Sequence, residues 1–170
     1  MSDSETNTKV PLIKGLHHNA YRCRDSEETR QFYEDFLGLP LAATLELGET
    51  KTGRSCSALH TFYRMQDGSF MAFFEVPDSD YDFKDWHDFD LHIALEVEHA
   101  HMLTMKAKGE AENREVRGVV DHGFIHSIYF RDPNGYVIEL TSVVGDEGES
   151  EEQSARAKLD TWQASKHVHA

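Results

Sequence analysis

The sequence has little positive charge. Of its 170 residues, 17 are lysine or arginine and 31 are aspartate or glutamate, so the formal net charge is −14. A protein that binds nucleic acid needs a basic face that displaces counterions from phosphates, and an anionic membrane surface attracts basic proteins for the same reason. Neither partner is therefore expected. No apolar run at the start of the sequence resembles a signal peptide, and none elsewhere is long enough to span a bilayer.

Thiols are also scarce. Cys23 and Cys56 are too few for a disulfide framework, and no CxxC pair is present for a zinc ribbon. Two reduced thiols are typical of a cytoplasmic protein, which is the predicted location. Hydrophobic residues make up 39% and charged residues 28%, as in ordinary globular proteins. A chain of this length can bury a core without disulfides or metals to stabilise it.

The sequence nearly repeats itself. Residues 16–25 read LHHNAYRCRD and residues 91–98 read LHIALEVE, and both are short alternating patterns that begin at histidine and end at an acidic residue. Each is followed by a helical pattern, SEETRQFYEDFLGL or HAHMLTMKAKG, with Gly38 and Gly109 as the expected helix ends. Further strands are predicted at residues 42–46, 57–65 and 69–76, and at residues 115–119, 125–131 and 135–142.

The order β-α-β-β-β therefore occurs twice. It predicts an α+β fold of two βαβββ modules side by side, which form a curved mixed sheet around a metal cavity with the helices outside. Residues 1–10 are predicted to be a disordered tail, and residues 11–145 a single domain with modules at 12–78 and 88–143. Residues 146–170 form an acidic linker and a C-terminal helix, whose apolar stripe predicts packing on the sheet or on a second subunit.

In the second module, strand alternation separates two faces. Ile93 and Leu95 suit packing under the helix, which leaves His92 on the opposite face. In VIELT, Ile138 goes to the helix side and Glu139 to the face of His92.

The first module is interpreted in the same way. His18 begins the first strand and faces away from the helix, and FMAFFEV is read with Phe73 and Glu75 on that same face. Phe73, together with His60 and Phe62 of the preceding strand, is a candidate for substrate contact, although core packing or surface exposure explains these side chains as well.

Carboxylates are rarely buried unless they are paired or bound to metal. Imidazole and carboxylate together bind Fe(II), Mn(II), Ni(II), Co(II) or Zn(II). Two histidines and one carboxylate with open positions suit non-haem Fe(II), and a second carboxylate suits an octahedral metal that keeps two waters. The sequence therefore predicts a divalent-metal site made from His18, His92 and Glu139, joined by Glu75.

The motifs LHHNAYRCRDSEETRQFYEDFLGL, LHIALEVE and SIYFRDPNGYVIELT span residues 16–142 and resemble the vicinal oxygen chelate superfamily, which contains glyoxalases, extradiol dioxygenases, epimerases and antibiotic-resistance proteins. In that superfamily the first-strand histidine and last-strand glutamate of paired modules bind the metal. The resemblance thus implies His18, Glu75, His92 and Glu139 as ligands, and it implies a homodimer.

The segment DHGFIHSIYFRDPNGYVIE resembles the extradiol dioxygenases that cleave catechols. This resemblance implies Tyr129, ten residues before Glu139, as a hydrogen-bond donor and His122 as a base. His126 has the opposite strand parity and ranks below His122. The first hypothesis is therefore an Fe(II)-dependent dioxygenase that acts on a small aromatic or vicinal-diol substrate.

Two alternatives remain open at this point. Extradiol enzymes of this type usually have three metal ligands, so a metal-bound Glu75 favours a lyase or isomerase of the glyoxalase or epimerase type. The other alternative is a non-enzymatic resistance protein that sequesters a small molecule. Substrate identity lies outside what these motifs specify.

Overall fold

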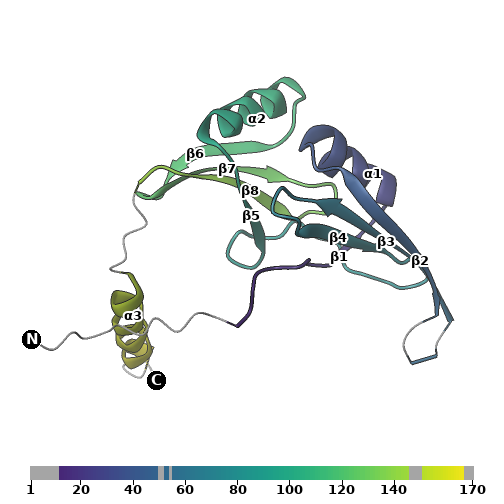
Figure 1. Ribbon diagram of the computed structural model, residues 1–170, viewed down its shortest axis with the longest axis horizontal. Coiled ribbons are helices and arrows are strands. Elements are labelled where there is room, and N and C mark those ends of the chain that lie inside the picture. Colours follow the sequence, from purple (N-terminus) through teal and green to yellow (C-terminus); the bar gives the residue numbers. More distant parts are fainter. Residues whose placement is uncertain (1–11, 50–51, 54, 146–150, 167–170) are drawn as a thin grey trace, which may run out of the picture. The chain divides into compact units, whose positions relative to one another are not determined.

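The computed structural model describes residues 12–49, 52–53, 55–145 and 151–166 (Figure 1). The chain divides into two compact units, which are described separately. Unit 1 contains residues 1–85 and 132–135, and unit 2 contains residues 86–131 and 136–170. The predicted tail at residues 1–10 and the start of the acidic linker lie outside the described residues.

Unit 1 is a four-stranded mixed sheet with a helical segment after its first strand. Its strand order is β1-β4-β3-β2, with β1 parallel to β4 and the other pairs antiparallel. The elements are β1 (Tyr21–Cys23), α1 (Ser26–Arg30), the π-helical turn η1 (Gln31–Phe36), β2 (Leu41–Glu49), β3 (Ser55–Arg64) and β4 (Phe70–Glu75).

Unit 2 repeats this plan. Its strand order is β5-β8-β7-β6, with β5 parallel to β8, and α2 lies over one face of the sheet (Figure 1). The elements are β5 (His92–Glu96), α2 (His99–Ala111), β6 (Val116–Asp121), β7 (Ile125–Arg131), β8 (Val137–Val143) and the C-terminal helix α3 (Glu151–Lys166). The predicted α+β fold of two βαβββ modules is confirmed.

The first helix begins where capping chemistry predicts. The carboxylate of Asp25 accepts hydrogen bonds from the backbone N–H groups of Glu27 and Glu28, both at 2.8 Å, which satisfies donors of the first turn. Gly38, with φ of 83°, follows the end of η1 and adopts a conformation that favours glycine.

The prediction that α2 ends at Gly109 is wrong, because the helix continues to Ala111. Gly109 is buried, and a Cβ built on it would lie 2.6 Å from the ring of Phe130 and 2.8 Å from Val116. The glycine therefore allows close packing of the helix on the sheet.

The core of unit 1 identifies the helix side of its sheet. The ring of Tyr33 from η1 lies 4.6 Å from the ring of Phe73 and 5.5 Å from that of Tyr63. All three side chains are fully buried. Phe73 on β4 and Tyr63 on β3 therefore face the helices.

The turn at residues 132–135 belongs to unit 1 and is held by buried polar groups. Tyr33 donates a hydrogen bond from its hydroxyl to Asp132 at 3.0 Å. The side chain of Asn134 accepts from the backbone N–H of Arg24 at 2.8 Å and donates to Thr29 at 3.3 Å. These bonds satisfy polar atoms that burial removes from water.

In unit 2 the predicted helix side of the sheet is confirmed. Ile93 of β5 and Ile138 of β8 are buried, and Met102 of α2 contacts Ser142 of β8. The remaining apolar core of this unit comprises Met105, Ile128, Phe130, Tyr136, Val137 and Leu140.

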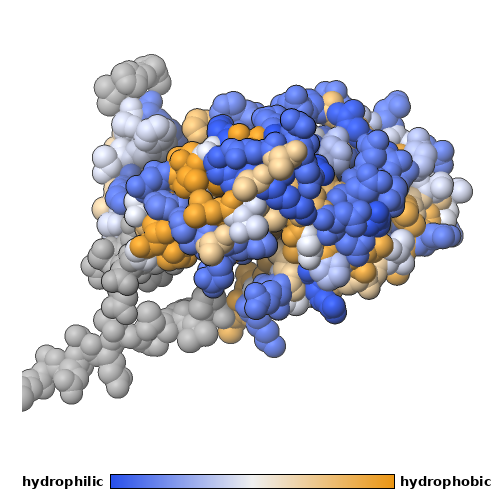
Figure 2. Space-filling view, turned by 90° about the horizontal axis from the view of Figure 1, so that it is seen from above, coloured by the Kyte–Doolittle hydropathy of each residue, from blue (hydrophilic) through white to orange (hydrophobic). Residues whose placement is uncertain are grey.

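Much of the surface is hydrophilic. In the space-filling view, polar side chains cover most of the visible face, with smaller hydrophobic patches between them (Figure 2). On α3, Leu159 and Trp162 of the predicted apolar stripe are exposed. Among the helices of the described residues, none has the length and apolar character needed to cross a membrane.

Candidate functional site

The sheet of unit 2 carries a hollow of about 680 Å³ on the face that alternates with the buried core positions. All the residues that line it belong to this unit: Asp88, Phe89, His92, Arg117, Val120, His122, Phe124, Ile125, Tyr129 and Glu139. The predicted site residues His92, His122, Tyr129 and Glu139 are thus brought together.

Glu139 is the buried acidic group of the hollow. It lies on β8, pairs with Ala94 of β5 and is only 5% exposed. One carboxylate oxygen, Oε2, lies 3.4 Å from Nε2 of His92. A buried carboxylate needs compensation by hydrogen bonds or by a positive charge.

The orientation of His92 is set by its other ring nitrogen. Nδ1 lies 2.7 Å from the main-chain oxygen of Asp88, and since a carbonyl can only accept, Nδ1 must carry the proton. In the neutral ring, Nε2 then presents a lone pair toward Oε2 of Glu139. Two acceptors that face each other repel unless a proton or a metal cation lies between them.

The other oxygen of Glu139 is held by Tyr129. The Tyr129 hydroxyl donates to Oε1 at 3.2 Å, and Nε2 of His122 lies 3.0 Å from the same hydroxyl. Because the tyrosine proton is directed to the carboxylate, Nε2 of His122 acts as the donor to the tyrosine oxygen. Burial, and next the negative charge of Glu139, raise the pKa of Tyr129, so the phenol stays protonated.

An ion pair forms part of the lining. Arg117 pairs with the carboxylate of Asp88, and its guanidinium carbon lies 4.4 Å from the centre of the Tyr129 ring. Burial pushes the pKa of Asp88 upward, but the hydrogen bond and charge of Arg117, with smaller contributions from His87 and His92, hold the pKa below its usual value. Asp88 is therefore an anion that neutralises Arg117.

The donors of unit 2 fit a divalent metal by their chemistry. An imidazole nitrogen and a carboxylate oxygen face each other, and both side chains are oriented by outer contacts, with Asp88 behind His92 and Tyr129 behind Glu139. Within the part of the chain that the structure describes, no three His, Cys, Asp or Glu side chains are gathered as a complete metal-binding cluster.

In unit 1, three predicted site residues share the face away from α1. His18 pairs with Phe70 at the edge of the sheet, and its ring centre lies 5.6 Å from that of Phe62 and 6.3 Å from that of His60. His60 is buried and stacks on Phe74 with 3.6 Å between ring centres.

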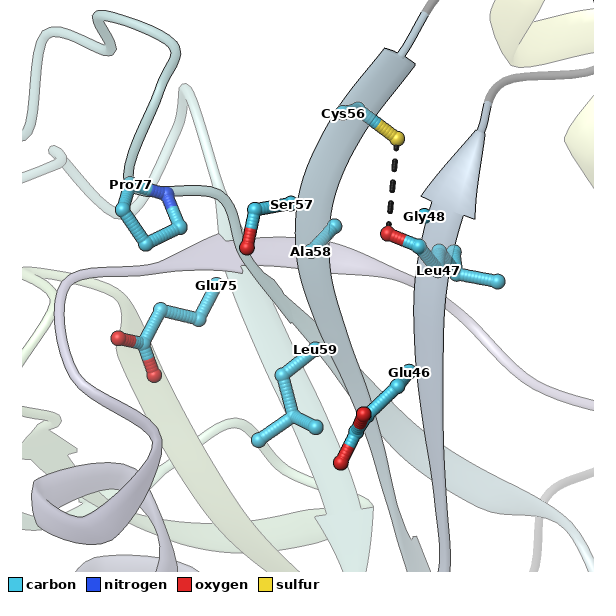
Figure 3. Close-up of a pocket in the computed structure, with 9 residues that line it drawn as sticks. All are labelled: Glu46, Leu47, Gly48, Cys56, Ser57, Ala58, Leu59, Glu75 and Pro77. Carbon is cyan, nitrogen blue, oxygen red and sulfur yellow. Dashed lines mark hydrogen bonds between the residues drawn. The ribbon is translucent and has the colours of Figure 1, made fainter.

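Glu75 lies on the opposite face, so the predicted placement beside His18 is wrong. Its carboxylate accepts a hydrogen bond of 2.8 Å from the backbone N–H of Ser26, the first residue of α1. On this side Glu75 borders a second hollow, of about 370 Å³, with Glu46 and Leu59 on the neighbouring strands (Figure 3).

Phe73 shares this correction, since it is fully buried against Tyr33 rather than placed for substrate contact. The physical reason is that the segment FMAFFEV is apolar at both parities, so hydrophobic alternation cannot select its buried face.

The strand register identifies which residues correspond between the units. His18 pairs with Phe70 in parallel, and His92 pairs with Val137. Two residues further on, Ala72 of unit 1 therefore occupies the position that Glu139 occupies in unit 2.

Sequence reasoning missed Arg117 and Asp88. Arg117 pairs directly with Tyr129, so the correct register of β6 against β7 would have placed it. The ladder is irregular between Gly118 and Val120, which obscures the alternation. Asp88 lies outside the strands and has no periodic signal.

Comparisons with known proteins address the family. The model of the Glyoxalase/Bleomycin resistance protein/Dioxygenase superfamily matches residues 15–140. Comparison with curated proteins gives no match.

Among solved structures, a glyoxalase/dioxygenase from Nostoc punctiforme is 21% identical, with 79% of this chain and 94% of that chain covered and a TM-score of 0.60. The fosfomycin resistance protein FosX from Listeria monocytogenes, complexed with Mn(II) and sulfate, is 20% identical, with coverage of 84% and 98% and a TM-score of 0.57. A glyoxylase/bleomycin resistance protein/dioxygenase domain from Frankia sp. EAN1pec is 15% identical, with coverage of 78% and 99% and a TM-score of 0.62. At these identities the structures show a shared fold.

Proposed function

Because the chain belongs to the Glyoxalase/Bleomycin resistance protein/Dioxygenase superfamily, we propose that it is a metal-dependent enzyme that cleaves the ring of a catechol, an Fe(II) dioxygenase of the extradiol type. One observation carries this proposal. The side chains of His122, Tyr129, Glu139 and His92 form an unbroken series of contacts along one hollow.

His92 and Glu139 would hold the metal, and His18 as a third ligand stays a prediction from the sequence. Two histidines and one carboxylate are the ligand set that suits Fe(II), while Mn(II), Ni(II), Co(II) and Zn(II) accept the same donor types. When bound, the metal acts as a Lewis acid that favours the deprotonated form of a substrate hydroxyl.

The roles of the other two side chains follow from their contacts. His122 is exposed at the hollow, and an imidazole can accept the proton of a substrate hydroxyl near neutral pH. Tyr129, whose raised pKa keeps it protonated, can donate a hydrogen bond to the oxygen on which negative charge develops. The contact of Nε2 with the Tyr129 oxygen leaves Nδ1 of His122 as the basic atom in the neutral ring.

The alternative reactions have less support. A lyase or isomerase of the glyoxalase or epimerase type would need Glu75 as a metal ligand. The carboxylate of Glu75 instead accepts a hydrogen bond from the backbone N–H of Ser26 at the start of α1. A non-enzymatic binding protein has no need for a buried carboxylate oriented by a tyrosine. The Mn(II) in the FosX structure supports a divalent metal in this fold but does not select the reaction.

The test uses the full chain, purified without oxygen, loaded with Fe(II) and given a panel of catechols in an oxygen electrode. We expect oxygen uptake and a ring-opened, coloured product. His92→Ala should lose stoichiometric metal, whereas His122→Ala and Tyr129→Phe should keep the metal and lose turnover. His126→Ala is the matched control, because His126 lies on the same strand as Tyr129 with opposite parity. Absence of oxygen uptake by fully loaded protein would refute the proposal.

A homodimer and a cytoplasmic location also stay predictions. Sedimentation at several protein concentrations measures the first, and a single-chain mass at all of them would contradict it.

A further inference from the structure

We propose that Asp88 excludes anionic substrates by neutralising Arg117, so that the preferred catechol carries an uncharged, apolar substituent. This inference rests on the proposed function, since it concerns the substrate of that same hollow.

The apolar part of the hollow is the first observation. Four of the lining side chains are hydrocarbon: Phe89, Val120, Phe124 and Ile125. Phe89 is 95% exposed and Phe124 is 44% exposed, so both rings are accessible to a ligand. Burying an apolar substituent against such rings is favourable, whereas a charged substituent would lose hydration there.

The cation of the hollow is the second observation. Arg117 is the one lysine or arginine among the described residues that line it, and it is ion-paired with Asp88. A substrate carboxylate that approached the guanidinium would meet the carboxylate of Asp88, which already contacts Nη2 of Arg117. The substrate carboxylate and that of Asp88 would repel each other, and such repulsion disfavours binding of the wrong ligand.

The charge balance agrees with this assignment. Arg117 and Asp88 together carry no net charge, so Glu139 contributes the remaining negative charge of the hollow. A bound divalent cation would then bring the net charge of the hollow to plus one. A singly deprotonated catechol cancels that charge, while a carboxylated catechol brings one negative charge too many.

The side chain of Asp88 can be changed without disturbing the metal ligand. His92 donates to the main-chain oxygen of Asp88, and the carboxylate contacts Arg117. Asp88→Asn is close to isosteric, keeps the main-chain acceptor and removes only the charge that neutralises the arginine.

The experiment measures binding rather than turnover. Protein loaded with Fe(II) is titrated without oxygen, by calorimetry, with 4-methylcatechol and with 3,4-dihydroxybenzoate. We expect the wild type to bind 4-methylcatechol more tightly. Asp88→Asn should shift the ratio of the two Kd values toward the carboxylate by about fivefold, the factor that corresponds to about 1 kcal/mol.

Two controls isolate the ion pair. In Asp88→Asn combined with Arg117→Met, the gain for the carboxylate should disappear. Asp90→Asn removes the same charge at a residue that does not line the hollow, and it should leave the ratio unchanged.

The inference would be overturned if the wild type bound 3,4-dihydroxybenzoate more tightly, or if Asp88→Asn left the ratio of the two Kd values unchanged. In either case, catechol binding and oxygen uptake would leave the proposed function standing. If the metal-loaded protein binds neither catechol, the proposed function and this inference fail together.

Discussion

Replacing Glu139 by glutamine should leave the metal-free protein at least as stable as the wild type and should make the metal-loaded protein less stable. The side chain of Glu139 is 7% exposed, with Tyr129 donating to Oε1 and Nε2 of His92 at 3.4 Å from Oε2. Glutamine keeps the size and the acceptor for Tyr129. Its amide can donate to the His92 lone pair, and it carries no charge that must be buried.

The magnitude follows from these contacts. Relieving a buried charge that is incompletely compensated is neutral to stabilising, at most about 1–3 kcal/mol, so metal-free Glu139→Gln should be as stable as the wild type or more stable. For a chain of this size, 1 kcal/mol corresponds to a shift of about 2–4 °C in Tm.

With metal bound, the wild type should be more stable than Glu139→Gln. At a free metal concentration of 100 Kd, the wild type gains about 2.7 kcal/mol, while the variant, which lacks the anionic ligand, gains much less. Thermal unfolding followed by circular dichroism, in EDTA and in excess Mn(II), measures both effects at pH 8.

Glu96→Gln serves as the control, because Glu96 is an exposed residue of β5 outside the hollow. Its Tm should respond to metal as the wild type does. If metal-free Glu139→Gln melts well below the wild type, the carboxylate is compensated by a protonated His92. If metal raises the Tm of Glu139→Gln as much as that of the wild type, Glu139 does not bind the metal.

Four further predictions concern stability and thiol chemistry. Burial raises the pKa of the Cys23 thiol to about 11 from an ordinary 9.0, so one thiol per folded chain, that of Cys56, should react with a disulfide reagent at pH 8. The unfolded thiol ionises first. The contribution of Cys23 to stability is therefore complete below pH 9 and is lost as the pH rises through about 11, a loss that Cys23→Ser should remove in melts across this range. Gly109→Ala should destabilise by about 1–3 kcal/mol in urea unfolding, because its Cβ would lie 2.6 Å from the buried ring of Phe130; an unchanged midpoint would contradict the packing argument. Asn134→Ala should cost about 2–4 kcal/mol in the same assay, since it removes side-chain hydrogen bonds from a site that is 1% exposed, and a loss below 1 kcal/mol would mean that water replaces them.

The sequence was most informative where polar and apolar residues alternate. In HIALE and VIELT the large apolar residues Ile93, Leu95, Ile138 and Leu140 share one parity, which places His92 and Glu139 on the other face. The cap at Asp25 depends on local chemistry, because its carboxylate bonds to N–H groups two and three residues further along the chain. The resemblance to extradiol dioxygenases pointed to Tyr129, and the β7–β8 register pairs this residue with Glu139.

The face of β4 could not be predicted in this way. Its residues are apolar on both faces, so the expectation that Glu75 corresponds to Glu139 rests on symmetry between the modules and not on alternation. The structure instead aligns Glu75 with Ser142. Each of these two side chains contacts the first residue of its own helix, Ser26 or His99.

The two units therefore share a backbone plan but not a set of reactive side chains. At corresponding register positions, unit 1 has Ala72 and Phe62 where unit 2 has Glu139 and Tyr129. A symmetric reading of the repeat gives each unit a first-strand histidine and a carboxylate, whereas the register gives unit 2 a carboxylate at this position and unit 1 an alanine. One carboxylate with two histidines is the donor set that leaves coordination positions open on Fe(II). The asymmetry of the repeat thus removes the argument from symmetry that made Glu75 a metal ligand.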